Sequence, residues 1–152
     1  MLRIFAVVVV AVLLATTASA EEWAYEGGSV PIAYIDNGTA QFQFACRGGD
    51  LAMGYWVRKP DRTVAGASVM NLALTPDAGG TTYAQEIPLI HSDGSSMIVR
   101  GPVARQWARI AQQARSTLRL AYVRGGREAF DANEFGAKGS SAAIKSVLDR
   151  CG

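Results

Sequence analysis

The side chains that could perform covalent chemistry gather around one histidine. His91 is the single histidine of the chain, and Ser95 and Ser96 follow it closely. A serine beside a histidine is the pair used by serine hydrolases, in which the imidazole accepts the hydroxyl proton. Neither serine lies in a Gly-x-Ser-x-Gly sequence, which holds the nucleophile on a sharp turn in one large class of these enzymes. We therefore expect no catalytic residue, and a small hydrolase that uses His91 with Ser95 or Ser96 is the alternative.

Ligands for metal ions and phosphate groups are also sparse. One histidine and two distant cysteines offer no close spacing of zinc ligands. The acidic pair Asp131 and Glu134 has no further metal-binding side chain near it in the sequence. The glycine pairs match no phosphate-binding loop and stand where turns are expected, at 27–28, 48–49, 79–80 and 125–126. The sequence predicts no metal ion and no cofactor.

Two groups of aromatic and basic side chains suit binding better than catalysis. Tyr55, Trp56 and Arg58 share an expected strand, so one of the two rings should face outward as an amphipathic surface for a partner. Arg105 and Arg109 are four residues apart, which places both on one face of an expected helix, where they could pair with carboxylate or phosphate groups. The simpler interpretation of the aromatic residues is core packing, and that of the two arginines is a solvated helix face.

The first twenty residues have the pattern of a cleavable secretory signal peptide. Arg3 precedes an apolar run over residues 4–15, which is shorter than the roughly twenty residues that a membrane-spanning helix needs. Ala18-Ser19-Ala20 then supplies small residues at the two positions that the peptidase recognises, and no cysteine follows directly. We expect cleavage after Ala20, a periplasmic or secreted protein, and no stable membrane insertion after processing.

Both cysteines, Cys46 and Cys151, lie in the part of the chain that should remain after cleavage. An even number of cysteines in an oxidising compartment most often pairs. Cys46 ends an expected strand and Cys151 an expected helix, each on the apolar side of its element. The sequence therefore predicts a Cys46–Cys151 disulfide, with two unpaired buried thiols as the alternative.

The charge of the chain gives little reason to expect nucleic acid or an anionic membrane as a partner, because the formal net charge is only +2. The charge is distributed unevenly. Residues 21–96 contain four Lys and Arg against nine Asp and Glu, whereas residues 97–152 contain ten against four. We interpret the two halves as solvated faces that balance within the fold, in preference to an anion-binding or partner surface.

The periodicity of apolar residues predicts one domain over residues 21–152, in the α+β class. Period-two runs bounded by turn residues predict about six to eight strands in a mainly antiparallel sheet, at about 30–34, 40–46, 51–57, 69–74, 81–87, 97–100, 118–123 and up to 135. Pro102 and a helical apolar stripe of Val103, Trp107, Ile110, Ala111 and Ala114 predict a helix near 102–114. Ser140 or Ser141 should cap a C-terminal helix near 140–150.

Three segments resemble small exported bacterial proteins. They are Trp23, the sequence Phe42-Gln43-Phe44-Ala45-Cys46, and a Phe-x-x-x-Gly-x-x-x-Ala sequence over 135–143 that leads to Cys151. From about Trp23 to the end, the chain resembles the VasI-like proteins associated with type VI secretion and the invasion-associated locus B family. The resemblance implies a periplasmic β-rich domain with this one disulfide, and it implies no enzymatic activity.

These patterns favour a non-enzymatic accessory or binding protein of the bacterial envelope that engages a protein or polymer partner. The alternatives are the hydrolase described above and an inhibitor of a secreted lytic enzyme. A compact, disulfide-linked domain could perform the second role by inserting one loop into its target.

Overall fold

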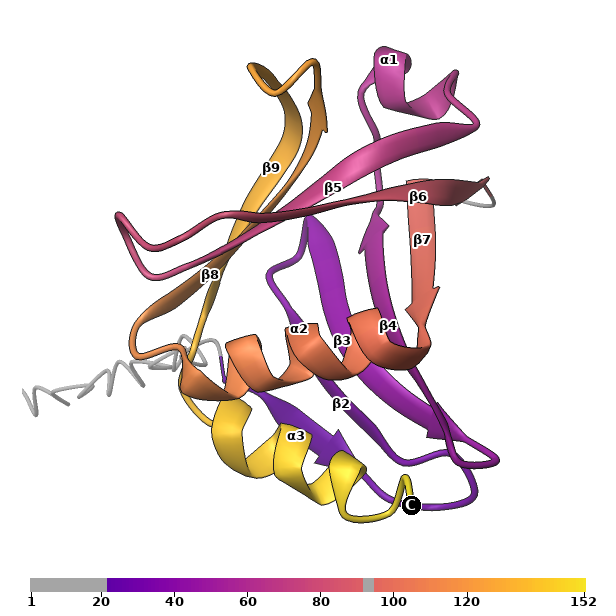
Figure 1. The fold of residues 1–152 in the computed structure, drawn as a ribbon, viewed down its shortest axis with the longest axis vertical. Helices are drawn as coiled ribbons and strands as arrows, with labels where there is room; N and C mark the ends of the chain where they lie inside the picture. The colour runs from indigo at the N-terminus through magenta and orange to yellow at the C-terminus, as the bar shows by residue number, and fades with distance from the viewer. Residues whose placement is uncertain (1–21, 92–94) are drawn as a thin grey trace, which may run out of the picture.

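The chain folds around one strongly bent antiparallel sheet (Figure 1). The computed structural model describes residues 22–91 and 95–152, with the backbone alone at 91 and 95–98. Within these residues nine strands follow the order β1-β2-β3-β4-β7-β6-β5-β8-β9, which confirms the predicted mainly antiparallel α+β class. The expected signal peptide, residues 1–20, and most of the turn expected at 92–95 lie outside the described residues.

One half of the sheet contains the N-terminal strands and β7. Their bounds are β1 Ala24–Glu26, β2 Ile32–Asp36, β3 Ala40–Arg47, β4 Asp50–Val57 and β7 Ser95–Arg100. The predicted hairpin of β2 and β3 is present: the Asn37 side-chain oxygen accepts hydrogen bonds from the backbone N–H groups of Thr39 and Ala40, and Gly38 has a φ of 85°. Along β3 the buried residues alternate with half-exposed ones and end at Cys46.

The other half of the sheet contains β5 Val69–Pro76, β6 Tyr83–His91, β8 Thr117–Arg124 and β9 Glu128–Gly136. Strand β6 joins the two halves. Its residues 83–88 pair with β5, whereas residues 89–91 pair with β7. Because the pairing changes partner along β6, the sheet turns sharply at this strand, and β7 runs away from it towards the helices (Figure 1).

Two helices lie side by side on the inner face of the first half of the sheet (Figure 1). Helix α2, Gly101–Gln113, packs on β4 and β7, and helix α3, Ser140–Leu148, packs on β1, β2 and β3. The predicted serine cap of α3 is wrong. Gly139, with a φ of 80°, precedes the helix, and the buried Ser140 hydroxyl instead donates to the Ala111 carbonyl at 2.9 Å, which ties α3 to α2.

Two short elements had no counterpart in the sequence prediction. Strand β1 is three residues long and adds a strand at the sheet edge, so the count exceeds the six to eight expected. Helix α1, Arg62–Ala65, follows the turn that ends β4 and begins at Asp61, whose carboxylate accepts from the Thr63 N–H. No helix in the described part of the chain is long and apolar enough to cross a membrane.

An aromatic cluster fills the space between the sheet and the helices. The rings of Phe42 and Phe44 lie 5.1 Å apart, and the Trp23 ring meets Phe42 edge-on at 5.3 Å. Cys46 and Cys151 are buried beside this cluster and form the predicted disulfide, with their Cα atoms 5.6 Å apart. The C-terminus is therefore tied covalently to β3.

Candidate binding site

Helix α2 presents two distinct stripes of side chains. One stripe, Ala104, Trp107, Ala108 and Ala111, is fully buried against the sheet. The other lies at the same helical spacing along the flank of the helix and contains Pro102, Arg105, Gln106, Arg109, Ile110 and Gln113. Ile110, which the sequence placed among the buried residues, is only half-buried on this second stripe. The second stripe forms one wall of a groove.

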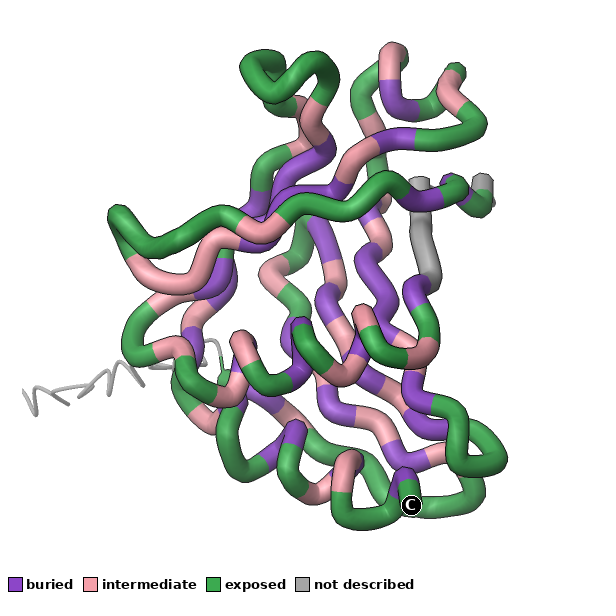
Figure 2. The backbone as a smooth tube through the Cα atoms, viewed as in Figure 1, coloured by how far each residue is buried: buried purple, intermediate pink, exposed green. Residues whose placement is uncertain are grey.

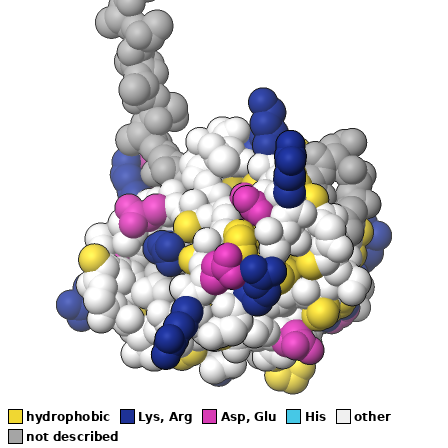
Figure 3. Space-filling view, turned by 90° about the horizontal axis from the view of Figure 1, so that it is seen from above, with side chains coloured by type: hydrophobic (Ala, Val, Ile, Leu, Met, Phe, Trp, Pro, Cys, Tyr) yellow, Lys and Arg dark blue, Asp and Glu magenta, His cyan; other side chains and the backbone are white. Residues whose placement is uncertain are grey.

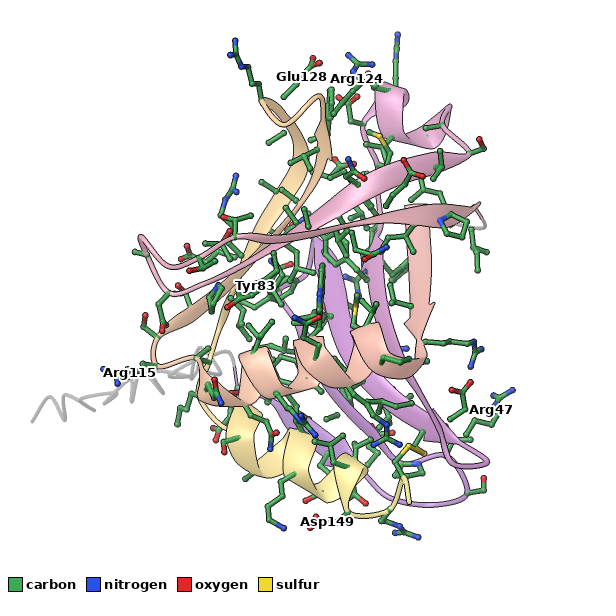
Figure 4. The ribbon with its side chains drawn as sticks, in the orientation of Figure 1. Arg47, Tyr83, Arg115, Arg124, Glu128 and Asp149 are labelled. Atoms are coloured by element: carbon green, nitrogen blue, oxygen red, sulfur yellow. A yellow bond between two sulfur atoms is a disulfide. The ribbon has the colours of Figure 1, made fainter. Side chains whose placement is uncertain are left out.

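The opposite wall of the groove comes from the β5–β6 hairpin. Tyr83, at the start of β6, is half-buried and projects towards α2 (Figure 4). Two adjoining hollows, of about 390 and 430 Å³, share Tyr83, Ile110 and Gln113 as lining residues. The first extends along α2 to Pro102, and the second reaches the hairpin loop at 76–81. The hollows form one open groove between α2 and β6, which we call the α2–β6 groove.

The α2–β6 groove is basic along its α2 wall. The Arg109 side chain is exposed, and among the described residues it has no ion-pair partner. The Arg105 Nη2 donates to the Cys151 carbonyl at 3.3 Å, which uses one of the five N–H groups of that guanidinium. The two arginines therefore lie together in one groove, and both can donate to an anionic ligand.

Asp77 fixes the end of the groove at the hairpin loop. Its carboxylate accepts hydrogen bonds from the backbone N–H groups of Arg115, Ser116 and Thr117, which follow α2. These donors lower the pKa of Asp77 to about 2, because they stabilise the ionised form. Gly80 is required in the same loop, since a Cβ there would lie 1.9 Å from the Pro76 carbonyl oxygen. The loop and α2 are thus held in a fixed relation.

Tyr55 does not belong to a surface, contrary to its place among the predicted binding residues. Its side chain is completely buried on the inner face of β4. The hydroxyl donates to the Asp131 carbonyl at 2.8 Å and accepts from the Asn133 side-chain amide at 2.8 Å. Burial raises the pKa of Tyr55 far above its ordinary value. Strand alternation decides the outcome, because adjacent residues face opposite sides of the sheet and Tyr55 occupies the inner side.

Trp56 and Arg58 lie on the outer face of the sheet, where the Arg58 guanidinium packs over the Trp56 ring. The Arg58 guanidinium carbon lies 4.9 Å from the centre of the Trp56 ring. The same guanidinium forms a two-pronged hydrogen bond with the Asp36 carboxylate, which lowers the pKa of Asp36. Trp56 faces away from α2, because its strand neighbour Tyr55 faces the helices' side of the sheet. The two predicted groups of binding residues are therefore on opposite faces.

The outer face of the sheet also contains a shallow depression of about 210 Å³. Small residues of β3 and β4, Ala45, Ala52 and Gly54, form its floor. The Gln43 side chain lies directly over Gly54, where a Cβ would approach it to 3.0 Å. At the rim, Arg100 forms an ion pair with Asp50 at 2.9 Å. With about half the volume of either hollow of the α2–β6 groove, this depression is the weaker candidate.

Charged side chains elsewhere are interspersed by sign. At the end of the molecule formed by α1 and the β8–β9 turn, Lys and Arg side chains alternate with Asp and Glu side chains (Figure 3). Arg124 pairs there with Glu128 at 2.7 Å, and both are labelled in Figure 4. Two ion pairs, Arg100–Asp50 and Lys138–Glu22, join the acidic and basic halves of the sequence. The opposite charges of the two halves are therefore neutralised in part by direct ion pairs.

The residues considered for hydrolysis lie on the β6–β7 hairpin. In the backbone register His91 pairs with Ser95, and Ser96 pairs with Ile90. The structure describes no side chains at His91, Ser95 or Ser96, so the hydrolase alternative stays a prediction. Among the described residues, no group of three His, Cys, Asp or Glu side chains is placed to hold a metal ion.

Sequence reasoning identified the two groove arginines but missed Tyr83, Ile110 and Gln113. The spacing of 102, 105, 106, 109, 110 and 113 is a regular helical stripe, so a second stripe beside the buried one could have been found. Tyr83 carried no such signal. Its position opposite α2 follows from the change of partner along β6, which is a property of the folded sheet.

Comparisons with known proteins bear on the fold alone. No protein-family model matches the chain, and no curated protein matches it. The crystal structure of invasion associated protein B from Bartonella henselae is similar, with a TM-score of 0.51 and 12% sequence identity, and the match covers 84% of this chain and 97% of that one. The two chains share a fold. The expected resemblance to the invasion-associated locus B family is thus confirmed for the fold, and the VasI-like resemblance stays a prediction.

Proposed function

We propose that this chain is an exported, non-enzymatic accessory protein of the bacterial envelope that binds a protein or polymer partner in the α2–β6 groove. One observation carries the proposal: the groove presents Arg109, which has no ion-pair partner among the described residues, in the same hollow as the aromatic ring of Tyr83. Grooves that combine apolar walls with a few placed polar groups are the usual form of binding sites. Arg and Tyr are also enriched where proteins meet their partners.

Export is supported by both ends of the chain. The first twenty residues have the signal-peptide pattern, with small residues at 18 and 20. Cys46 and Cys151 form a buried disulfide, and such bonds form and persist in oxidising compartments. We infer that the protein works in the periplasm or outside the cell after cleavage following Ala20.

The residues that line the groove favour binding over catalysis. Among the described residues they include no serine, cysteine or histidine, so the two commonest nucleophiles and the usual base near neutral pH are missing from these walls, and Thr81 is the one aliphatic hydroxyl. The only carboxylate among them is Asp77. Its pKa of about 2 and its hydrogen bonds to backbone N–H groups make it a poor general acid or base at neutral pH.

Site-specific photocrosslinking tests the proposal. A benzophenone amino acid replaces Gln106, which is exposed in the groove, in the host bacterium, and a matched variant places it at Arg127, in the exposed β8–β9 turn. We expect a discrete crosslinked partner from position 106 alone. The change Arg109→Glu should reduce that crosslink at least tenfold, because it reverses the charge of the groove wall, whereas Lys145→Glu on α3 should leave it unchanged.

Two results would count against the proposal. Crosslinking that is absent at position 106, or equal at 106 and 127, would show that the groove is not where a partner binds. Turnover of ester, peptide or glycoside substrates by the purified chain, abolished by His91→Ala with folding intact, would favour the hydrolase alternative.

A further inference from the structure

Strand β6 has one edge that no other described strand covers along most of its length. Residues 83–88 pair with β5 on one side, and β7 reaches the other side only at 89–91. The uncovered edge faces α2 across the groove, and the strand is exposed at Ala84, Gln85 and Glu86 (Figures 1 and 2). Six residues of open edge span roughly 20 Å, which is enough to pair with a strand of ordinary length.

The hydrogen bonds of β6 show which backbone groups face the open edge. The Leu89 N–H donates to the Ser68 carbonyl, on the β5 side, at 3.0 Å. Because alternate residues of a strand direct their N–H and C=O groups to the same side, Ala84, Glu86 and Pro88 direct theirs towards the open edge. Pro88 lacks an N–H, and proline in a sheet is normally placed on such an edge. The open edge therefore offers the N–H and carbonyl groups of Ala84 and Glu86, because the Leu89–Met97 pairing assigns the Pro88 carbonyl to β7.

The arginines across the groove have the spacing of side chains on an extended peptide. Arg105 and Arg109 are four residues apart on α2, so their Cβ atoms are about 6 Å apart. In an extended strand, side chains on one face repeat every two residues, at roughly 6.6 Å. Carboxylates at alternate positions of a strand beside β6 can therefore meet both guanidinium groups, and the next position on that face meets Tyr83 and Ile110, which line the same hollow.

We propose that the α2–β6 groove binds an extended acidic peptide segment of a partner protein, which adds to the open edge of β6 as an extra strand. The segment has two acidic residues at alternate positions and an apolar residue at the next alternate position. Strand addition provides main-chain hydrogen bonds for affinity, and the side-chain positions provide specificity. This inference rests on the proposed function, because it specifies the partner of the same groove.

Charge selects this occupant over a second copy of the chain. The β6 residues on the inner face, Tyr83, Gln85 and Ile87, include no carboxylate, so a second β6 would offer nothing to Arg105 and Arg109. The one acidic side chain of β6, Glu86, belongs to the opposite face, and in a symmetric β6–β6 pair two copies of it would share one surface. An acidic strand satisfies the groove, and a copy of β6 does not.

Selection from a phage-displayed library of random nine-residue peptides on the purified, disulfide-oxidised chain tests the proposal. We expect selected peptides with Asp or Glu at two alternate positions, an apolar residue at the next, and no proline between them. Arg109→Glu should weaken the binding of a selected synthetic peptide at least tenfold, and Arg127→Glu should change it less than twofold. The change Ala84→Pro, which removes one N–H from the open edge without removing a β5 partner, should also weaken binding at least tenfold.

N-methylation of the selected peptide provides a readout that does not depend on any variant of the chain. Methyl groups on one set of alternate amides should abolish binding, and methyl groups on the other set should leave it within threefold, because only one set faces β6. Equal effects of the two sets, or selected peptides without acidic residues, would overturn the inference. Concentration-dependent dimers blocked by Ala84→Pro would overturn it in favour of a second copy. A partner crosslinked at position 106 with no peptide selected would overturn strand addition and leave the proposed function standing.

Discussion

The carboxylate of Asp77 accepts hydrogen bonds from both the backbone N–H and the hydroxyl of Ser116, at 2.7 and 3.0 Å. Asp77 lines the α2–β6 groove at the start of the β5–β6 loop, and Ser116 lies just after the end of α2, which forms the opposite wall. Asp77 adopts a φ of 55°, a left-handed conformation that Asp tolerates better than most residues. One side chain thus sets the distance between the loop and the helix at that end of the groove.

Asp77→Asn should lower the stability of the fold at neutral pH and weaken groove binding. The folded-state pKa of Asp77, about 2, lies below its ordinary value of 3.8, so ionised Asp77 stabilises the fold above pH 4. That contribution is lost as the pH falls from about 4 to 2. Thermal unfolding from pH 7 to pH 2 should therefore show a gap between wild type and variant at neutral pH that closes in this acidic range. A gap that stays constant with pH would contradict the assignment.

Asp131→Asn should have the opposite effect on stability. Asp131 also has a positive φ, 48°, at the bulge of β9, and its carboxylate accepts from the Asp61 N–H at 2.9 Å. Burial raises the pKa of Asp131, and the nearby Asp61 charge raises it further. Ionisation of Asp131 is therefore less favourable in the folded chain than in the unfolded chain, and this cost is present at neutral pH and disappears at low pH. Asparagine keeps an acceptor and tolerates this φ without the charge.

The measurement is the free energy of urea unfolding of Asp131→Asn and wild type at pH 7 and pH 3. We expect a modest gain for the variant at pH 7 and no gain at pH 3. Asp77→Asn, measured in parallel, is the matched control, because it makes the same chemical change at another half-buried, left-handed aspartate, whose pKa is lowered instead. A loss of stability at pH 7 in both variants would show that the Asp131 charge is satisfied in the fold.

Reduction of the Cys46–Cys151 disulfide should destabilise the chain strongly. The bridge joins residues 105 positions apart, and closing so long a loop restricts the unfolded chain by about 4 to 5 kcal/mol in the loop-entropy model. A paired replacement, Cys46→Ala with Cys151→Ala, should lower the free energy of unfolding by about 2 to 5 kcal/mol. The wild type with and without reductant in urea gives the comparison, and the variant should be insensitive to reductant. Equal stability of the oxidised and reduced wild type would contradict this expectation.

The strands that depend on a long alternation were predictable from sequence, and the shortest elements were not. β3 alternates over eight residues, and Cys46 faces inward as predicted. In β2 the alternation of Ile32 and Tyr34 was visible, but the fully buried residues are their neighbours Ala33 and Ile35. Tyr34 therefore lies on the outer face, where its hydroxyl donates to Glu26 of β1 at 2.8 Å. A period of two fixes the alternation of a strand but leaves open which face is buried.

The candidate site was predictable only along α2. Arg105 and Arg109 share a helix face because of the helical period, which sequence reveals. Their opposite wall is formed by a strand that lies some twenty residues earlier and changes pairing partner within its own length. Such tertiary pairing depends on contacts between distant segments, and nothing in the local pattern around Tyr83 encodes it. For the same reason, Tyr55 and Trp56 could not be assigned to the inner and outer faces in advance.

Tyr55→Phe separates a structural role of this residue from a binding role. The change removes only the hydroxyl, which donates to the Asp131 carbonyl and accepts from the Asn133 amide deep in the fold. The aromatic packing against Tyr122 and Phe135 remains. Asn133 keeps its hydrogen bond to the Asp131 carbonyl at 3.1 Å, but the other N–H of its buried amide loses the Tyr55 hydroxyl as its acceptor. We expect the free energy of unfolding to fall by about 1 to 2 kcal/mol in urea titrations.

Crosslinking at position 106 should be unchanged in Tyr55→Phe, because Tyr55 lines neither hollow of the groove. Weakened crosslinking at unchanged stability would instead return Tyr55 to the binding site.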